Sequence, residues 1–253
     1  MLGLCATEES AAAFVRAPFE VRAADISRRE SLPADFGRPD VLVHCASSGR
    51  GGVDAYRAVY RDGLRNLLEA LRPRHVIFVG STSVYGQTRG EWVDETSPAE
   101  PGVETGRVLL EAEALALAAG GCVLRLSALY GPARSVLMKK YLSGTAVLED
   151  GGGRWVNQIH RDDAARAILR VAGGGLDGIF NVSDNRPATQ REVYGWIAAH
   201  FGGDLPAEGP ANPHRKRGVT NKRVSNNKLR ASGWEPLHGD FRDALSAGAV
   251  SAA

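Results

Sequence analysis

Short apolar runs alternate with longer amphipathic stretches along most of the chain. A run of a few apolar residues that ends in turn-forming residues is typical of a buried parallel strand. The clearest run, VLVHC at 41–45, is followed by the glycine- and serine-rich residues 46–52. Similar runs predict further strands at residues 19–23, 75–79, 122–126 and 179–182.

Between these runs, apolar residues recur at steps of three and four, which predicts helices with one apolar face. The longest such pattern runs from Val53 to Leu71 and stops before Pro73, a residue that cannot continue a helix. Further helices are predicted at residues 8–16, 103–119, 135–142, 162–171 and 190–201. The stretch 202–218 is predicted to be a loop. Alternating strands and helices favour an α/β fold in which helices cover both faces of a parallel sheet.

The composition narrows the class of protein. Charged residues make up 24% of the chain and apolar residues 43%, as in ordinary globular proteins. Cys5, Cys45 and Cys122 lie too far apart for a zinc motif or a disulfide framework. No apolar run approaches the roughly 20 residues of a membrane span, and no signal peptide is evident. We therefore predict a cytoplasmic protein with reduced cysteines, no membrane partner and no metal site.

One cluster of positive charge stands out from a net charge of only +2. It consists of His214, Arg215, Lys216 and Arg217, with Lys222 and Arg223 close behind. Such a cluster could bind a nucleic acid, but no aromatic residue is interleaved with it, which favours a solvated loop. We therefore expect no nucleic-acid partner.

Three hydroxyl residues follow one predicted strand. The run VIFVGSTSVYG at 76–86 places Ser81, Thr82 and Ser83 at the carboxyl end of the strand. In open α/β sheets ligands bind at that edge, and hydroxyls there could polarise a carbonyl. A polar turn without a ligand is an equally good interpretation of the composition.

The order of several motifs resembles that of a known family. After VIFVGSTSVYG come DETSP, EAE, LRLSALYGP, QIHRDDAARAI and FNVSDNRP, and later KRVSN and GW. This ordered set resembles the extended and atypical short-chain dehydrogenase/reductases, near the NAD-dependent epimerase/dehydratases. The resemblance implies a Rossmann-like doubly wound parallel sheet that binds NAD or NADP, with a small C-terminal α/β lobe over the substrate. Residues 1–132, with segments returning from 154–183, would form the dinucleotide-binding part, and residues 133–253 mainly the lobe.

The resemblance also implies roles for individual residues. Ser81 matches the family's catalytic serine or threonine, and Thr82 and Ser83 adjoin it on the substrate side. The implied cofactor-binding positions are Asp25, Ile26, Cys45, Ala46, Ser47 and Tyr130. The other implied substrate-binding positions are His160, Arg215 and Lys216.

The family's YxxxK motif is absent. Its tyrosine donates a proton and its lysine lowers the pKa of that tyrosine, but the matching positions here are Thr105 and Leu109. A threonine hydroxyl is far less acidic than a phenol, and leucine carries no charge. Tyr85, Tyr130 or His160 could supply a proton instead. Alternatively, the two tyrosines pack beneath the cofactor or substrate, and the histidine caps the helix predicted near residue 162.

The family's GxGxxG turn is absent as well. The chain opens with MLGLCATEES, which resembles the family's second strand and the turn after it. We therefore expect the biological protein to begin about 20 to 30 residues earlier, with a strand, a glycine-rich turn and a helix. Cys5, Ala6 and Thr7 stand where an acidic residue would favour NAD and an arginine NADP, so both cofactors stay open.

Two functions remain. The leading hypothesis is an NAD(P)-dependent oxidoreductase, epimerase or dehydratase that acts on a small polar substrate, sugar-like or nucleotide-linked, with a degenerate active site. The alternative is a non-catalytic sensor or scaffold that binds a dinucleotide. A hydrolase built from Ser81, His160 and Asp162 lacks the GxSxG elbow. Pairing of long helices is common in the family, which leaves a homodimer open.

Overall fold

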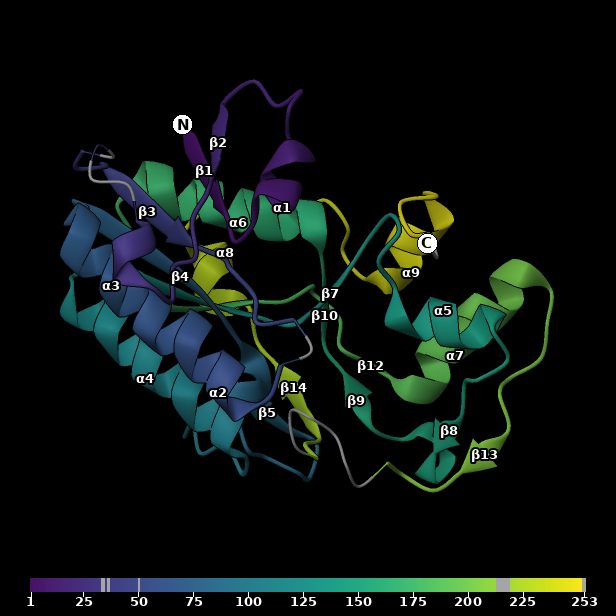
Figure 1. Cartoon of the computed structure of the whole chain (residues 1–253). Helices are drawn as coiled ribbons and strands as arrows, with labels where there is room; N and C mark the ends of the chain where they lie inside the picture. Colours follow the sequence, from purple (N-terminus) through teal and green to yellow (C-terminus); the bar gives the residue numbers. More distant parts are fainter. Residues whose placement is uncertain (33–34, 36, 50, 213–218, 252–253) are drawn as a thin grey trace.

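A four-stranded parallel sheet organises the chain (Figure 1). Its order is β11-β6-β4-β3, and every neighbouring pair is parallel. The strands are β3 (Val41–His44), β4 (His75–Ser81), β6 (Cys122–Leu126) and β11 (Gly178–Val182). The computed structural model describes residues 1–253 apart from 33–34, 36, 50, 213–218 and 252–253. The predicted parallel α/β architecture is therefore confirmed.

The two faces of the sheet are covered by different helices. Val76, Phe78 and Val123 point to the face covered by α2 (Val53–Tyr56), α3 (Gly63–Leu71) and α4 (Glu104–Ala118). Ile77, Leu124 and Phe180 point to the opposite face, which α6 (Arg161–Gly174) and α8 (Asn227–Ala231) cover. Successive residues of a strand face opposite sides, so a strand buried on both faces must be apolar throughout.

The helix predicted from Val53 to Leu71 contains an irregular segment. Residues Arg57–Asp62, between α2 and α3, form a π-helix, which is wider than an α-helix. The segment buries Tyr60 against the core and is followed by Gly63, the first residue of α3. A Cβ at Gly63 would lie 2.9 Å from the side chain of Ile26, so the close approach of the two segments requires glycine there.

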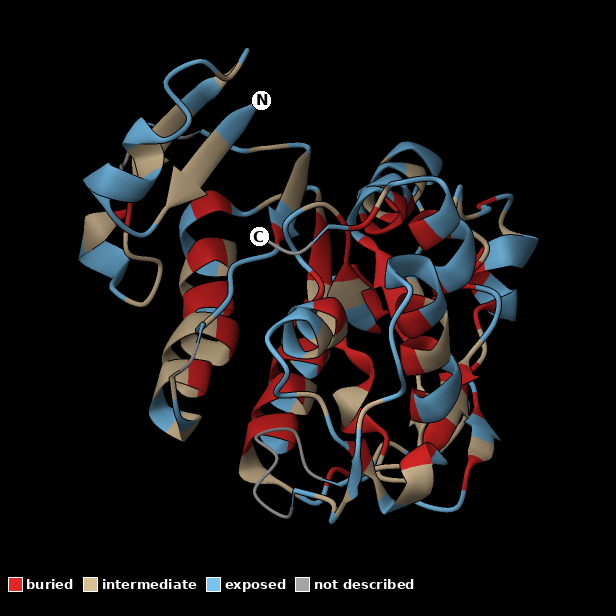
Figure 2. Cartoon of the chain, turned by 90° about the vertical axis from the view of Figure 1, so that its right-hand side faces the viewer, coloured by how far each residue is buried: buried red, intermediate tan, exposed pale blue. Residues whose placement is uncertain are grey.

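The N-terminal residues form a separate small sheet. β1 (Leu2–Cys5) and β2 (Glu20–Ala23) pair in parallel, and α1 (Glu8–Ala12) lies in the connection between them. Among the described residues, β1 and β3 share no ladder, and none of residues 1–23 is buried (Figure 2). The helix predicted at 8–16 ends early because it has no buried face to stabilise it.

A second group of short elements has its own apolar core. It contains the helices α5 (Val136–Leu142), α7 (Gln190–Phe201) and α9 (Phe241–Ser246). Its short strands are β7 (Ala128–Tyr130), β8 (Leu148–Glu149), β9 (Trp155–Val156), β10 (Gln158–His160), β12 (Ala188–Thr189) and β13 (Glu208–Gly209). β13 lies in the stretch predicted as a loop, and residues 213–218 of that stretch lie outside the described residues.

Two further short strands join these groups. β5 (Glu91–Val93) pairs in parallel with β14 (Lys222–Val224), and β14 also lies against β9. Single 3-10 turns occupy Arg29–Ser31, Thr82–Val84 and Asp150–Gly152. β5 and β14 are each only three residues long, so contacts with distant segments rather than local sequence hold them in place.

Candidate functional site

The hydroxyl residues after β4 are fixed by local hydrogen bonds. Ser81 is the last residue of β4, and its Oγ accepts a hydrogen bond from the backbone N–H of Ser83 at 3.2 Å, which starts the turn Thr82–Val84. Thr82 donates from Oγ1 to the carbonyl of Leu126 at 3.4 Å, across the end of β6. The carboxyl edge of a parallel sheet is where ligands bind in such folds. The turn therefore holds three hydroxyls at the expected place.

The segment after the neighbouring strand is open. Cys45, Ala46 and Ser47, which directly follow β3, are all exposed. Ser47 accepts a hydrogen bond from the N–H of Gly49 at 3.2 Å, which shapes the turn before α2. Exposed backbone at the carboxyl end of a parallel strand is suited to contact a ligand that lies along the sheet edge.

Asp25 and Ile26 lie just after β2 and are separated from its last residue, Ala23, by Ala24. The Asp25 carboxylate accepts hydrogen bonds from the N–H and hydroxyl of Ser27 at 3.0 and 2.7 Å. The carbonyl of Ile26 accepts from the side chain of Asn66 at 3.0 Å. Both residues are half-buried. An acidic side chain just after a strand suits the adenosine end of a dinucleotide, whereas the sequence holds no GxGxxG turn for its pyrophosphate.

Tyr85 belongs to an interior polar network. Its side chain is fully buried, and its hydroxyl donates to Oδ1 of Asn181 at 2.9 Å. The guanidinium of Arg125 lies 4.9 Å from the ring and is bonded to Glu113 at 2.6 Å. Burial raises the pKa of Tyr85 above the ordinary value of a phenol. The structure thus gives this phenol a hydrogen-bonded role inside the core.

The positions of the missing YxxxK are packed rather than open. Thr105 and Leu109 both lie on the buried face of α4. Leu109 belongs to the core cluster that also holds Tyr56 and Val108. The apolar side chain at 109 therefore contributes to packing at the place where family members with YxxxK carry a charge.

Tyr130 and His160 lie in the second core. Tyr130 is buried, and its ring packs edge-on against His160 and Phe241 at 5.3 and 5.2 Å. His160 accepts at Nδ1 from the N–H of Asp162, so it caps α6 as one interpretation predicted, and Nε2 donates to the carbonyl of Ala249 at 3.1 Å. Both nitrogens of His160 are therefore used within the fold. Arg215 and Lys216 lie outside the described residues.

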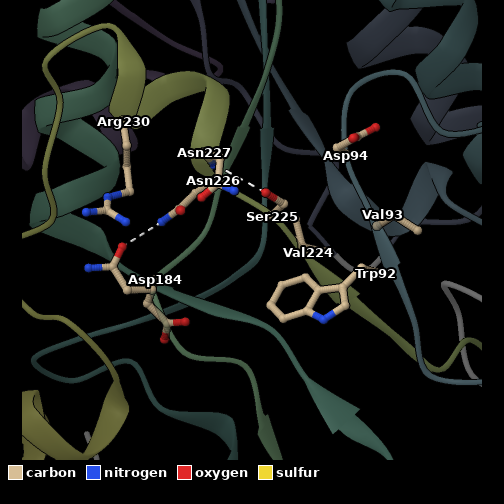
Figure 3. A pocket seen from close by; sticks show the side chains of 10 residues that line it. Trp92, Val93, Asp94, Asp184, Val224, Ser225, Asn226, Asn227 and Arg230 are labelled. Atoms are coloured by element: carbon tan, nitrogen blue, oxygen red, sulfur yellow. Dashed lines mark hydrogen bonds between the residues drawn. The ribbon is translucent and has the colours of Figure 1, made fainter.

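A cavity of about 310 Å³ lies between β5, β14, α8 and the segment that follows the carboxyl end of β11 (Figure 3). Trp92, Asp94, Asn227 and Arg230 are among its lining residues. No residue from the carboxyl ends of β3 and β4 lines it. Three of the family-like motifs, DETSP, FNVSDNRP and KRVSN, supply part of its wall. The sequence alone does not predict this cavity, because its wall comes from segments far apart in the chain.

The described residues contain no group of histidine, cysteine or carboxylate side chains that could hold a metal ion. Within the same residues, no helix is long and apolar enough to cross a membrane.

Comparisons with known proteins identify the family. The family model "NAD dependent epimerase/dehydratase family" matches residues 5–183. The chain is 33% identical over 175 residues to the protein YeeZ of Escherichia coli K12, a match that spans 66% of this chain and 61% of YeeZ.

Solved structures agree. A candidate NAD-dependent epimerase/dehydratase from Methylobacillus flagellatus is 30% identical, with a TM-score of 0.77 and coverage of 97% of this chain and 95% of that one. The NAD complex of dTDP-glucose 4,6-dehydratase from Bacillus anthracis, 20% identical, shares the fold, with a TM-score of 0.78 over 96% of this chain and 84% of that one. The chain therefore belongs to the NAD-dependent epimerase/dehydratase family.

Proposed function

We propose that the chain is an NAD(P)-dependent enzyme of the oxidoreductase, epimerase or dehydratase type, acting on a small polar substrate that is sugar-like or nucleotide-linked. The observation that carries the proposal is the Ser81 turn, which sets a hydroxyl at the carboxyl edge of the sheet. The M. flagellatus structure and the family match support the same class of enzyme.

The residues proposed to hold the cofactor are those at the open sheet edge. Asp25 and Ile26 would contact the adenosine end, and the backbone of Cys45, Ala46 and Ser47 would line the dinucleotide. When bound, NAD(P) would supply the site with a hydride acceptor or donor.

Ser81 would bind the reacting oxygen of the substrate, with Thr82 and Ser83 shaping the pocket beside it. A hydroxyl fixed by its own cap needs little reorganisation when charge develops on that oxygen. Because Thr105 and Leu109 provide no acidic proton and no cation, proton transfer would depend on water or on the substrate's own groups. We therefore expect turnover to be slow compared with family members that have YxxxK.

The test is oxidation of NADH and NADPH across a panel of carbonyl compounds that includes nucleotide-linked sugars. We expect Ser81→Ala to lower turnover by roughly 100-fold, the usual cost of losing one donor to a developing oxyanion. Ser81→Thr keeps the hydroxyl and should retain activity, and the exposed Ser143→Ala is the matched control. Equal turnover in the wild type and Ser81→Ala would contradict the assigned role.

A second function is favoured by the packed positions 105 and 109. A dinucleotide-binding sensor or scaffold would need the fold and the open edge but no acid. Calorimetric binding of NAD(P)H without turnover on any carbonyl of the panel would favour this alternative. Absence of binding and of turnover would exclude both.

A further inference from the structure

Two nearly buried side chains of the cavity in Figure 3 have an oxygen atom without a partner. Asp184 is 3% exposed, and its Oδ1 accepts no hydrogen bond from any described residue. Asn226 is 4% exposed, and its Nδ2 donates to the carbonyl of Ser183 and to Oδ1 of Asn185, both at 2.9 Å. Within the described part of the chain, this leaves Oδ1 of Asn226 free to accept. Unpaired acceptors on nearly buried side chains favour a ligand that carries O–H or N–H groups.

The cavity also has an aromatic wall, the indole of Trp92, which is 55% exposed. The guanidinium of Arg223, the neighbour of Trp92 in the β5–β14 ladder, covers one face of this ring at 5.1 Å. The same guanidinium lies 5.0 Å from the ring of Trp155, and its Nε donates to the carbonyl of Gly90 at 2.8 Å. The indole is therefore held in place from behind while much of its surface stays open to a ligand.

The charges on the wall are balanced. The Nε of Arg230 donates to both carboxylate oxygens of Glu235 at 2.9 Å. Asp94 accepts at Oδ1 from the N–H and the hydroxyl of Thr96 at 2.9 and 2.7 Å, and these bonds lower the pKa of Asp94. Burial raises the pKa of Asp184, which favours its neutral form. The wall thus combines one carboxylate with one paired guanidinium, which selects neither an anion nor a cation.

We propose that this cavity binds a monosaccharide, a small neutral ring that carries several hydroxyl groups. The C–H face of a sugar ring can pack against the indole of Trp92, and its hydroxyls can donate to Asp184 and Asn226. The volume of about 310 Å³ is at the lower end for ligand pockets and suits one such ring. The proposal does not rest on the proposed function, because no residue of the Ser81 turn lines the cavity.

The test measures binding of D-glucose, D-galactose and D-mannose to the full chain without cofactor, by NMR titration observed on the sugar. We expect saturable binding of at least one hexose with a Kd of about 1 mM or lower, the range for a ligand of this size. Glycerol has hydroxyls but no ring to pack on the indole, so it should bind at least about tenfold more weakly. No saturable binding of any of the three sugars, or equal binding of glycerol, would overturn the proposal.

Two variants locate the bound sugar. Trp92→Ala removes the aromatic wall and should raise the Kd by roughly five- to tenfold. Asn227→Ala should raise it by about threefold, because this exposed amide lines the cavity and makes no side-chain hydrogen bond with the described residues. Phe201→Ala, at an exposed aromatic residue of α7 outside the cavity, is the matched control and should leave the Kd unchanged. If Trp92→Ala fails to fold, Asn227→Ala decides, and an unchanged Kd in the folded variants would overturn the proposal.

Ser81→Ala separates this site from the proposed function. It should bind the hexose with the wild-type Kd, since its side chain lies outside the cavity. Binding that is lost in Ser81→Ala but kept in Trp92→Ala would place the sugar at the Ser81 turn and overturn the proposal. Loss of turnover in Ser81→Ala, in contrast, bears only on the proposed function.

Discussion

Several residues that define this fold are charged side chains held inside it. Arg125 of β6 and Glu113 of α4 are both nearly inaccessible and bonded to each other, so the pair joins a strand to the helix that covers it. Breaking one member of such a pair leaves an uncompensated charge, typically at a cost of about 3 to 5 kcal/mol. Glu113 therefore has a structural reason to be kept even where the catalytic pair of the same helix is absent.

A substitution at Leu109 tests whether the YxxxK positions face the core or a solvent-filled cleft. Leu109→Lys places an ammonium in the cluster that holds Tyr56 and Val108, where it has no partner. We expect a loss in free energy of unfolding of about 3 to 5 kcal/mol, as for other unpaired buried charges. Urea unfolding measures it, with Leu109→Met, which keeps volume and polarity, as the control. A near-neutral Leu109→Lys would mean that position 109 opens to solvent or cofactor.

The buried carboxyl of Asp184 should make the stability of the fold depend on pH. Asp184 is 3% exposed, and burial raises its pKa well above the ordinary value of an aspartate. The folded protein therefore binds a proton that the unfolded chain has released, so this group destabilises the fold as pH rises from its ordinary pKa toward the raised one. At neutral pH, Asp184→Asn should unfold at a higher temperature than the wild type.

The gain from Asp184→Asn should shrink as the pH is lowered toward 4, where the wild-type carboxyl is also neutral. Thermal unfolding of both proteins between pH 4 and 8 measures the difference, and the exposed Asp204→Asn serves as the control. A gain that is independent of pH would contradict the assignment of this proton to residue 184.

Among the helices and strands, those with a regular apolar pattern are predicted from the sequence, and the shortest ones are not. β6 and α7 have the predicted bounds, because each has a full apolar face or run that meets the core. β5, β14, α8 and α9 were not predicted, since each is six residues or fewer and depends on contacts with distant segments. Lys222 illustrates the point, because it stands in a basic cluster in the sequence but in a buried strand in the fold.

In the candidate site too, the sequence predicts the positions of residues on clear strands but not their contacts with distant segments. Ser81 was predicted at a strand end because the strand itself is clear in the sequence, and the structure places it there. The partners of Tyr85 were not predictable, because Asn181 is 96 residues away and only the parallel sheet brings the two together. Chemistry that depends on one strand can be predicted from sequence, whereas networks between strands cannot.

The whole molecule is unevenly stabilised. The sheet of β1 and β2 contacts the remainder chiefly through a small cluster in which Ala24 and Leu32 meet Leu67 and Leu71 of α3. Leu2 and Val43, on two edges that share no ladder among the described residues, are 39% and 36% exposed. Little apolar burial therefore holds the N-terminal unit to the central sheet.

Hydrogen exchange should show this difference. We expect backbone amides of β1 and β2 to exchange at least about tenfold faster than those of β6, because opening the small unit exposes little apolar surface. Exchange measured by mass spectrometry on peptides from both regions checks it, with α7 as a second reference inside a core. Equal protection of β1 and β6 would mean that the two sheets unfold as one unit.

The π-helical segment Arg57–Asp62 makes the helix sensitive to the deletion of a single residue. Each residue of an α-helix turns it by about 100°, so removing one residue here would restore an ordinary helix and rotate one half against the other. Tyr56 and Tyr60 would then rotate away from the core cluster that they share with Leu64. A substitution on the outer side of the helix leaves this geometry unchanged, whereas a single-codon deletion within Arg57–Asp62 would turn the two halves of the helix relative to each other.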